Sequence, residues 1–528
     1  MRTACETAVS EVQQNSACFH TMNKKTPFTD NKRNIVRKEF FVVGKKMEGT
    51  EQERNGEKRL MMTDRLQESM QYLNRRLAVD KNFDMLYRVI HIGGKEAAFY
   101  FIDGFCKDEM MEKLLQYFIS IKEDEMSEDV HGMLKKHMPY VEVDVSDQWE
   151  TIIRNIMSGV FGLFIDGYEK CILIDSRTYP ARSVSEPEKD KALRGSKDGF
   201  VETVVFNTAL IRRRIRSTEL RMEMLNAGDS SQTDIVLCYM ESRVNQDYLQ
   251  KLKTRISEIK VDALTMNQES LAECLYKRCW YNPFPKFKFT ERPDTAAAQI
   301  LEGDIVILVD NSPSAMITPT TVFDVVEEAD DYYFPPITGT YLRLSRFLIA
   351  VLTYFLTPTF LLLMQNPEWI PESFAFIMVK DTINIPLIWQ FILLELAIDG
   401  LRLAAVNTPN MLSTPLSVLA ALVLGEFSVN SGWFNSEVML YMAFVAIANY
   451  TQASYELGYA LKFMRILNLI LTSIFGLWGY VAAVVFCIVA IVCNRTVAST
   501  SYIYPLVPFD GKKLCRRFFR LRLPEARK

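Results

Sequence analysis

Three ionisable residues, Glu395, Asp399 and Arg402, interrupt an apolar stretch at residues 385–406 that is otherwise long enough to cross a lipid bilayer. At about 100° per residue they fall within an arc of about 60° on one helix face. Each charge near the centre of a membrane helix costs about 2.5–3.5 kcal/mol, whereas each of the roughly dozen Leu, Ile, Phe and Val residues there returns about 0.3–0.6 kcal/mol. The gain does not cover the cost, so the charged face must meet protein, water or its own partners.

The charged face has two possible roles. Arg402 lies one turn from Asp399 and is expected to neutralise it. In the structural interpretation, ion pairing among the three side chains fixes helix packing. In the functional interpretation, the three side chains line a path for an ion or a polar solute. Glu426 and Asn430, spaced i and i+4 in the next apolar stretch, are further candidates for a polar face inside the membrane.

Four arginines, Arg212, Arg213, Arg214 and Arg216, form the strongest charge cluster outside the apolar stretches. They could hold an anion or meet an acidic lipid surface or a partner. The alternative is a solvated helix end. Nucleic-acid binding is not expected, because the formal net charge is −3 and no recognised nucleic-acid module accompanies the cluster.

The sequence shows no other pattern that could carry catalysis. Its four histidines lack metal-ligand spacing, and it contains no GxSxG, Walker or GxGxxG motif. Gly93 and Gly94 lie between two expected strands and are read as a turn rather than a phosphate loop. We therefore expect no catalytic residue, no metal and no cofactor, and a protein that is not an enzyme.

The front and back halves of the chain differ in character. Alternating helical and β-rich patterns precede residue 330, and apolar segments follow residue 347. Met61 and Met62 are candidate start residues. We expect a flexible extension at residues 1–66, α/β subdomains at 67–198 and 199–330, a linker at 331–343, an all-α polytopic transmembrane domain at 344–495 and a basic cytoplasmic tail at 496–528.

Charge sets the expected orientation. Arg343 and Arg346 precede the first apolar segment, and eight Lys or Arg residues lie in 512–528, which places the α/β region and the tail in the cytoplasm. An even number of crossings is then required, so four of five apolar segments should span. Segments 416–429 and 438–450 are short and are candidates for re-entrant or interfacial structure. The apolar segments are residues 347–364, 385–406, 416–429, 438–450 and 466–493.

Several runs of residues resemble the spore germinant-receptor A-subunit (GerA) family. The resemblance extends from about residue 67 to 515, and within the family residues 179–182 (YPAR) and 290–303 are most similar to the stage V sporulation AF subfamily. The first 66 residues are not required by the family pattern. The runs are 183–188 (SVSEPE), 198–203 (DGFVET), 207–216 (NTALIRRRIR), 290–294 (TERPD), 317–321 (ITPTT), 373–376 (SFAF), the charged stretch around residue 399, 407–409 (NTP) and 454–457 (SYEL).

The resemblance implies a multi-pass protein of the inner membrane of a bacterial endospore. It implies a homo-oligomer in the lipid bilayer that takes part in ion release at germination. A-subunit relatives are understood to assemble as ligand-gated cation channels with B and C subunits, whereas the AF subfamily is tied to a small membrane partner and to amplified ion efflux. The alternative implied by the family is a germinant-sensing A subunit that does not itself conduct.

Overall fold

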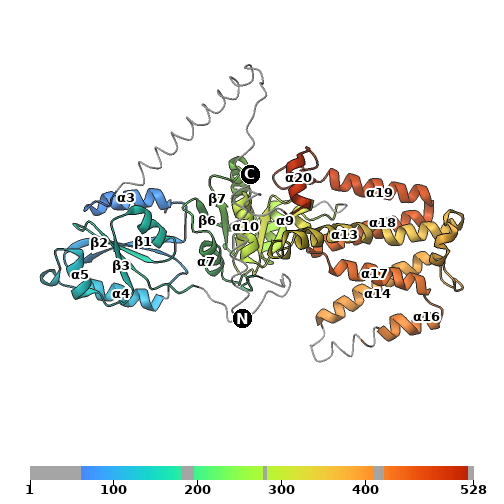
Figure 1. Ribbon diagram of the computed structural model, residues 1–528, viewed down its shortest axis with the longest axis horizontal. Helices are drawn as coiled ribbons and strands as arrows, with labels where there is room; N and C mark the ends of the chain where they lie inside the picture. Colours follow the sequence, from blue (N-terminus) through green and yellow to red (C-terminus); the bar gives the residue numbers. More distant parts are fainter. Residues whose placement is uncertain are drawn as a thin grey trace, which may run out of the picture. The chain divides into compact units, whose positions relative to one another are not determined.

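The computed structural model describes residues 61–106, 108–179, 195–276, 282–407, 418 and 421–520. Most of the expected extension at 1–66 and the last eight residues of the expected tail lie outside these ranges. The described part consists of two α/β units and a helical region, whose helices and strands can be followed in Figure 1. The α/β architecture followed by apolar helices is the fold class that the sequence predicts.

The first α/β unit is built on a five-stranded sheet with the order β1-β2-β4-β5-β3, in which every neighbouring pair is antiparallel. Gly93 and Gly94 form the β1–β2 turn with φ of 51° and 76°, and Gly167 (φ 79°) forms the β4–β5 turn. The elements are α3 (Leu66–Leu77), β1 (Met85–Ile92), β2 (Lys95–Ile102), α4 (Asp108–Ser120), η1 (Glu123–Glu125), α5 (Val130–His137), β3 (Val143–Ser146), α6 (Trp149–Ile156), β4 (Phe161–Ile165) and β5 (Cys171–Ile174).

The second unit repeats the same strand order, because its sheet runs β6-β7-β9-β10-β8 and is again antiparallel throughout. Both faces of this sheet are covered, since its central strands β7 and β9 are buried almost without interruption. The elements are α7 (Val204–Arg214), β6 (Leu220–Ala227), β7 (Thr233–Met240), α8 (Gln246–Ser257), α9 (Gln268–Leu275), β8 (Lys288–Thr290), α10 (Pro293–Glu302), β9 (Ile305–Val309) and β10 (Ala315–Thr318).

A fully buried ion pair joins the two units. Arg212 of α7 donates from Nε and Nη2 to the two carboxylate oxygens of Asp84, which lies immediately before β1, over 2.8 Å each. Beside it, the Met222 amide donates to Asn82 Oδ1 over 2.9 Å. Arg212, which the sequence placed in a possible anion-binding cluster, is therefore part of the internal framework.

The helical region begins earlier than expected. Residues 336–343, assigned from the sequence to a linker, are the first turns of α13, the longest helix described. In Figure 1, α13, α18 and α19 run alongside one another. The elements are α11 (Val322–Val326), α12 (Asp330–Tyr333), α13 (Pro336–Gln365), η2 (Pro367–Trp369), η3 (Glu372–Ile377), α14 (Leu387–Asn407), the π-helical η4 (Ala421–Phe427), α16 (Ser428–Asn430), α17 (Ser436–Tyr450), α18 (Tyr455–Phe475), α19 (Leu477–Val492) and α20 (Gly511–Phe518).

Residues 466–493, expected as one long apolar segment, are divided between α18 and α19. The break lies at Gly476, whose φ of 58° and ψ of −132° an L side chain rarely adopts. A Cβ at Gly479 would overlap the Leu471 carbonyl, so the turn requires a small residue there too. By length and composition, α13 and α18 can cross a membrane, with mean hydropathy of 2.1 and 1.3, while α17 and α19 are shorter apolar helices.

We expect Arg212→Met to lower the free energy of unfolding by about 3–5 kcal/mol, because it leaves Asp84 buried without its cation. Urea titration of the purified protein measures this change. Arg216→Met is the matched control, since Arg216 is exposed and its loss should stay within about 0.5 kcal/mol. Equal effects of the two substitutions would contradict a framework role for Arg212.

Candidate functional site

The charged face of α14 packs against two cations supplied by α18. Glu395 is 4% exposed, and its Oε1 accepts from Arg465 Nε over 2.9 Å and also from Arg465 Nη2. Arg465 is fully buried and donates from Nη1 to the Thr353 carbonyl of α13 over 3.1 Å. A single guanidinium therefore joins α13, α14 and α18.

Lys462, one turn before Arg465 on α18, completes the pairing. Its Nζ lies 3.3 Å from Glu395 Oε2 and forms a further ion pair with Asp399. Both carboxylates of α14 are bound by cations of another helix. The energetic cost of placing these charges among apolar residues is therefore offset by ion pairs between helices rather than within α14. We call Glu395, Asp399, Arg402, Lys462 and Arg465 the charged cluster.

The prediction that Arg402 neutralises Asp399 is wrong. The Arg402 guanidinium lies over the rings of three tyrosines, at 5.5, 4.8 and 5.1 Å from the ring centroids, and cation–π attraction replaces the expected ion pair. Lys462 occupies the position beside Asp399 instead. The rings belong to Tyr450 at the end of α17 and to Tyr455 and Tyr459 at the start of α18.

The charged cluster surrounds a cavity of about 20 Å³, which has room for roughly one water molecule. All three residues predicted from α14 line it, together with Lys462 and Arg465. Three cations and two carboxylates give this lining a formal charge of +1. In the arrangement described, the carboxylates are therefore occupied by protein cations, and an ion would have to compete with Lys462 and Arg465 to reach them.

Glu426 and Asn430 lie elsewhere. They are exposed on η4 and α16, outside the described lining of the charged cluster's cavity. An i, i+4 pair shares one face only in an α-helix, but Ala421–Phe427 is π-helical, and its wider turn changes which residues share a face. Lys462 and Arg465, by contrast, are not among the site residues predicted from the sequence. Their i, i+3 spacing on an amphipathic helix was the signal that could have identified them.

The arginine cluster at 212–216 does not form one binding surface. Arg214 pairs with Asp198 over 2.6 Å, and Arg213 lies 4.7 Å from the ring centroid of Tyr179. Arg216 donates to Ser158 Oγ over 3.3 Å. Arg212 is buried against Asp84, and Arg213 and Arg216 both contact Tyr179, so the four arginines do not share one common set of partners.

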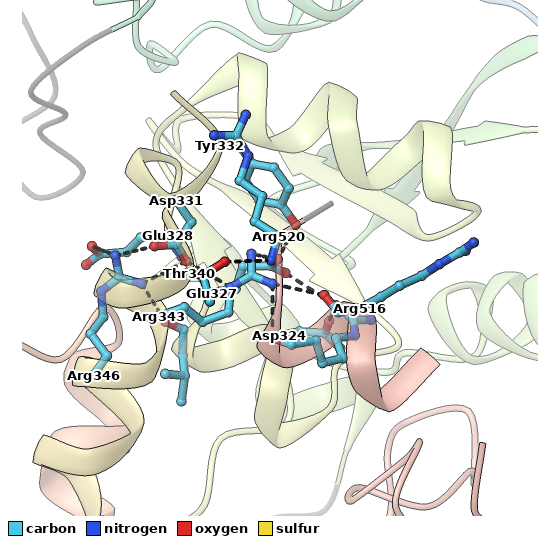
Figure 2. Close-up of polar contacts among 12 residues, drawn as sticks. Asp324, Glu327, Glu328, Asp331, Tyr332, Thr340, Arg343, Arg346, Arg516 and Arg520 are labelled. Atoms are coloured by element: carbon cyan, nitrogen blue, oxygen red, sulfur yellow. Dashed lines mark hydrogen bonds and ion pairs between the residues drawn. The ribbon is translucent and has the colours of Figure 1, made fainter. Parts of the chain in front are cut away.

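A second group of buried charges lies where the second α/β unit continues into α13 (Figure 2). Arg343 of α13 pairs with Glu327 over 2.7 Å and donates from Nε to Asp331 over 3.3 Å. Arg346, one turn later, holds Asp331 through both guanidinium ends, over 2.9 and 2.7 Å. Asp331 is fully buried, so it depends on both arginines. Arg343 and Arg346 were predicted only as markers of membrane orientation.

The C-terminal helix α20 returns to this junction. Arg343 donates from Nη1 to the carbonyls of Arg516 and Arg517 over 3.2 and 3.0 Å, and Arg517 pairs in turn with Asp324 and Glu327. We call Asp324, Glu327, Asp331, Arg343, Arg346 and Arg517 the junction network. Burial raises the pKa of Glu327, but the charges of Arg343, Lys288 and Arg517 lower it by a larger amount. The pKa of Glu327 therefore lies below its ordinary value.

A family model described as "Bacillus/Clostridium GerA spore germination protein" matches residues 71–528. The chain is 35% identical to "Stage V sporulation protein AF" of Bacillus subtilis (strain 168), over 87% of this chain and 92% of that protein. It is 25% identical to "Spore germination protein KA" of the same organism, over 84% and 82% of the two chains. Among solved structures it is similar to the N-terminal domain of the A subunit of the Bacillus megaterium spore germinant receptor GerK3, with a TM-score of 0.39 and 23% identity, over 49% of this chain and 96% of that chain.

Substitution of Arg465 by Met should strongly reduce the yield of folded protein, because Glu395 then keeps only Lys462 in a buried setting. Combining Arg465→Met with Glu395→Leu should recover much of the loss, since no unpaired charge remains. Size-exclusion chromatography in detergent with thermal unfolding measures both effects. Arg402→Met is the control, with an expected cost of about 0.5–1 kcal/mol for the lost cation–π contact. A double variant no better than Arg465→Met alone would contradict the pairing.

Stability of the junction network should fall in acid. A carboxyl whose pKa is lowered by folding stabilises the protein fully at a pH above its pKa in the unfolded state, which is about 4.3 for Glu. This contribution is lost as the pH falls through the lower pKa of the folded state. The difference in melting temperature between the wild type and Glu327→Gln should therefore be constant from neutral pH to about pH 5, and shrink below that. A difference independent of pH would contradict the shift.

Proposed function

Because the chain belongs to the GerA family of spore germination proteins, we propose that it is a membrane subunit of an ion-conducting or ion-release-amplifying complex in the spore inner membrane. The observation that carries the proposal is the charged cluster. Buried ion pairs are often no more stable than well-packed apolar side chains of similar volume, so stability alone does not account for five charges among apolar helices. Ionisable groups within a membrane region mark ion pathways and gates by default.

The charged cluster has the properties of a closed gate. Its cavity holds about one water, and Lys462 and Arg465 occupy the carboxylates that a cation would need. Ion passage past this point requires α18 to separate from α14, which would free Glu395 and Asp399 to face the ion. The cluster therefore serves as the latch of the closed state, and its carboxylates become part of the path when it opens.

The junction network supplies a connection from this gate to the α/β region. Arg343 and Arg346 anchor the start of α13, and Thr353, ten residues further along the same helix, accepts the hydrogen bond from Arg465. Ten residues of α-helix span about 15 Å. A change at the α/β end of α13 therefore reaches the charged cluster through one continuous helix.

Orientation and assembly complete the proposal. Arg520 donates its amide to Thr340 Oγ1 over 3.1 Å, so the chain after α19 returns to the start of α13, which favours the α/β region and the tail on one cytoplasmic side. Large apolar side chains such as Ile474, Trp478 and Val485 are exposed, which suits contact with lipid or neighbouring subunits. The expected partners are further copies of the chain and a small membrane protein, or germinant-receptor B and C subunits.

The second candidate is a germinant-sensing subunit that does not itself conduct. Membrane current from the purified protein in planar bilayers, alone and with its partner subunits, separates the two. That the chain has no catalytic residue, no cofactor and no metal remains a prediction.

We expect Asp399→Asn to increase potassium leak from unstimulated spores, because Lys462 loses one of its two carboxylate partners and the latch is weakened. Potassium release normalised to protein per spore is the measurement. Asp381→Asn, an exposed carboxylate in the segment before α14, is the matched control and should leave the leak unchanged. Slower release without leak would indicate a path residue rather than a latch, and unchanged leak and release would leave only a structural ion pair.

A further inference from the structure

The chain that follows α19 exposes three large apolar side chains within four residues. Leu506, Val507 and Phe509 lie in the turns that precede α20 and are 46%, 52% and 73% exposed. Tyr502, a few residues earlier, is fully buried, so this stretch is anchored at one end and open at the other. Single exposed apolar residues are ordinary, whereas a group of them marks a surface that another molecule covers.

Basic side chains follow these apolar ones directly. Residues 510–520 contain five cations and one carboxylate, and one of the cations, Arg517, is held by the junction network. The other four cations and the carboxylate leave a formal charge of +3. The carboxylate, Asp510, caps α20 by accepting from the Lys513 amide over 3.1 Å. Lys512 and Lys513 are both exposed in the first turn of α20, so positive charge and apolar surface are close together in the chain.

Contacts with α13 place α20 where the apolar part of the helical region begins. The Phe518 ring lies 5.2 Å from the Phe347 ring, measured between centroids, and Arg343, one turn before Phe347, donates to two carbonyls of α20. Phe347 is the first residue of the uncharged section 347–364, which rises about 27 Å and so nearly matches a hydrocarbon core of about 30 Å. A bilayer that covers this section has headgroups at the level of α20.

Exposed tryptophans mark the opposite boundary. Trp369, which follows α13, is 50% exposed, and Trp478, at the start of α19, is 80% exposed. Gln365 at the end of α13 donates to the Ser473 carbonyl of α18 over 3.5 Å, so these helix ends lie together. Tryptophan is enriched where lipid meets water. The apolar section of α13 therefore has a tryptophan-marked end and a basic end, and α20 lies at the basic end.

We propose that residues 506–513 bind acidic lipid headgroups in the leaflet that faces the α/β region. The apolar side chains of Leu506, Val507 and Phe509 enter the headgroup layer, and Lys512 and Lys513 contact the phosphates. Apolar burial combined with electrostatic attraction to anionic lipid is how interfacial segments bind membranes. A protein partner would cover the apolar side chains without requiring a net positive charge beside them. The inference rests on the proposed membrane location of the helical region.

The proposed lipid contact would also bear on the junction network. Arg517, four residues after Lys513 on the same short helix, pairs with two carboxylates of that network, and α20 accepts two hydrogen bonds from Arg343. A lipid surface that holds the start of α20 would therefore keep its end against α13. The acidity of the leaflet then becomes a factor in the stability of the junction network.

Photo-crosslinking of the full-length protein tests the proposal. p-Benzoylphenylalanine replaces Phe509 or, in separate samples, Phe475, the last residue of α18, or Phe206 on α7, which are 62% and 46% exposed. The protein is irradiated in nanodiscs of equimolar phosphatidylglycerol and phosphatidylcholine, and mass spectrometry identifies the adducts. We expect about three- to fivefold more phosphatidylglycerol than phosphatidylcholine at position 509. Position 475 should give similar amounts of both lipids, and position 206 should give none.

Two pairs of adjacent lysines separate headgroup recognition from the net charge of the protein. In the protein labelled at position 509, Lys512→Gln combined with Lys513→Gln should bring the ratio of the two lipid adducts close to one. Lys135→Gln combined with Lys136→Gln, an exposed pair on α5, is the matched control and should leave the ratio unchanged.

The position of the adducts distinguishes the possible failures. Lipid adducts at position 475 without any at position 509 would overturn the proposal and leave the membrane location intact, whereas their absence at both positions would overturn the membrane location as well. A crosslink from position 509 to a second protein chain would assign the apolar surface to a protein partner. A ratio near one at position 509 before any lysine is changed would overturn the recognition of acidic headgroups.

Discussion

A buried charge must be matched by a partner that the protein itself provides, and this requirement shapes each joint of the chain. Arg212 with Asp84 joins the two sheets, Arg343 and Arg346 with Asp331 join the α/β region to α13, and Arg465 with Glu395 joins the helices. In each case the cation is arginine, whose planar guanidinium offers several donors in fixed directions and so reaches two or three groups at once. Because the donor directions of a guanidinium group are fixed, each of these ion pairs also fixes the relative orientation of the elements that it connects.

The regular elements could be predicted because their signals are local. The glycine turns at 93–94 and 167, the β-rich runs around them and the apolar helices all follow from short stretches of sequence. The shared strand order of the two sheets was not foreseen, because an order of strands is set by contacts between distant segments. Gly476, with its positive φ, divides an apolar run that composition alone cannot separate into two helices.

The charged cluster could likewise be predicted only in part. The cost of burying charge predicted that one face of α14 needs partners, but the partner expected for Asp399, the nearby Arg402, contacts tyrosine rings instead. The cations that satisfy Glu395 and Asp399 lie more than sixty residues away in the chain. Spacing in the sequence favours ion pairs between neighbouring residues. In the folded protein, the pairs that form depend on geometry and on which other partners each side chain can reach. For Arg402 that alternative was a set of three aromatic rings.

The length of α13 has a mechanical consequence. Its thirty residues extend about 45 Å, which is longer than the roughly 30 Å of a bilayer's hydrocarbon core. With Thr353 as the fulcrum, the seventeen residues back to Pro336 form a lever arm of about 25 Å. A tilt of about 10° would move the outer end by about 4 Å while shifting the fulcrum hardly at all. In the proposed gate, the helix would therefore convert a displacement large enough to rearrange the salt bridges of the junction network into a small rotation at Arg465.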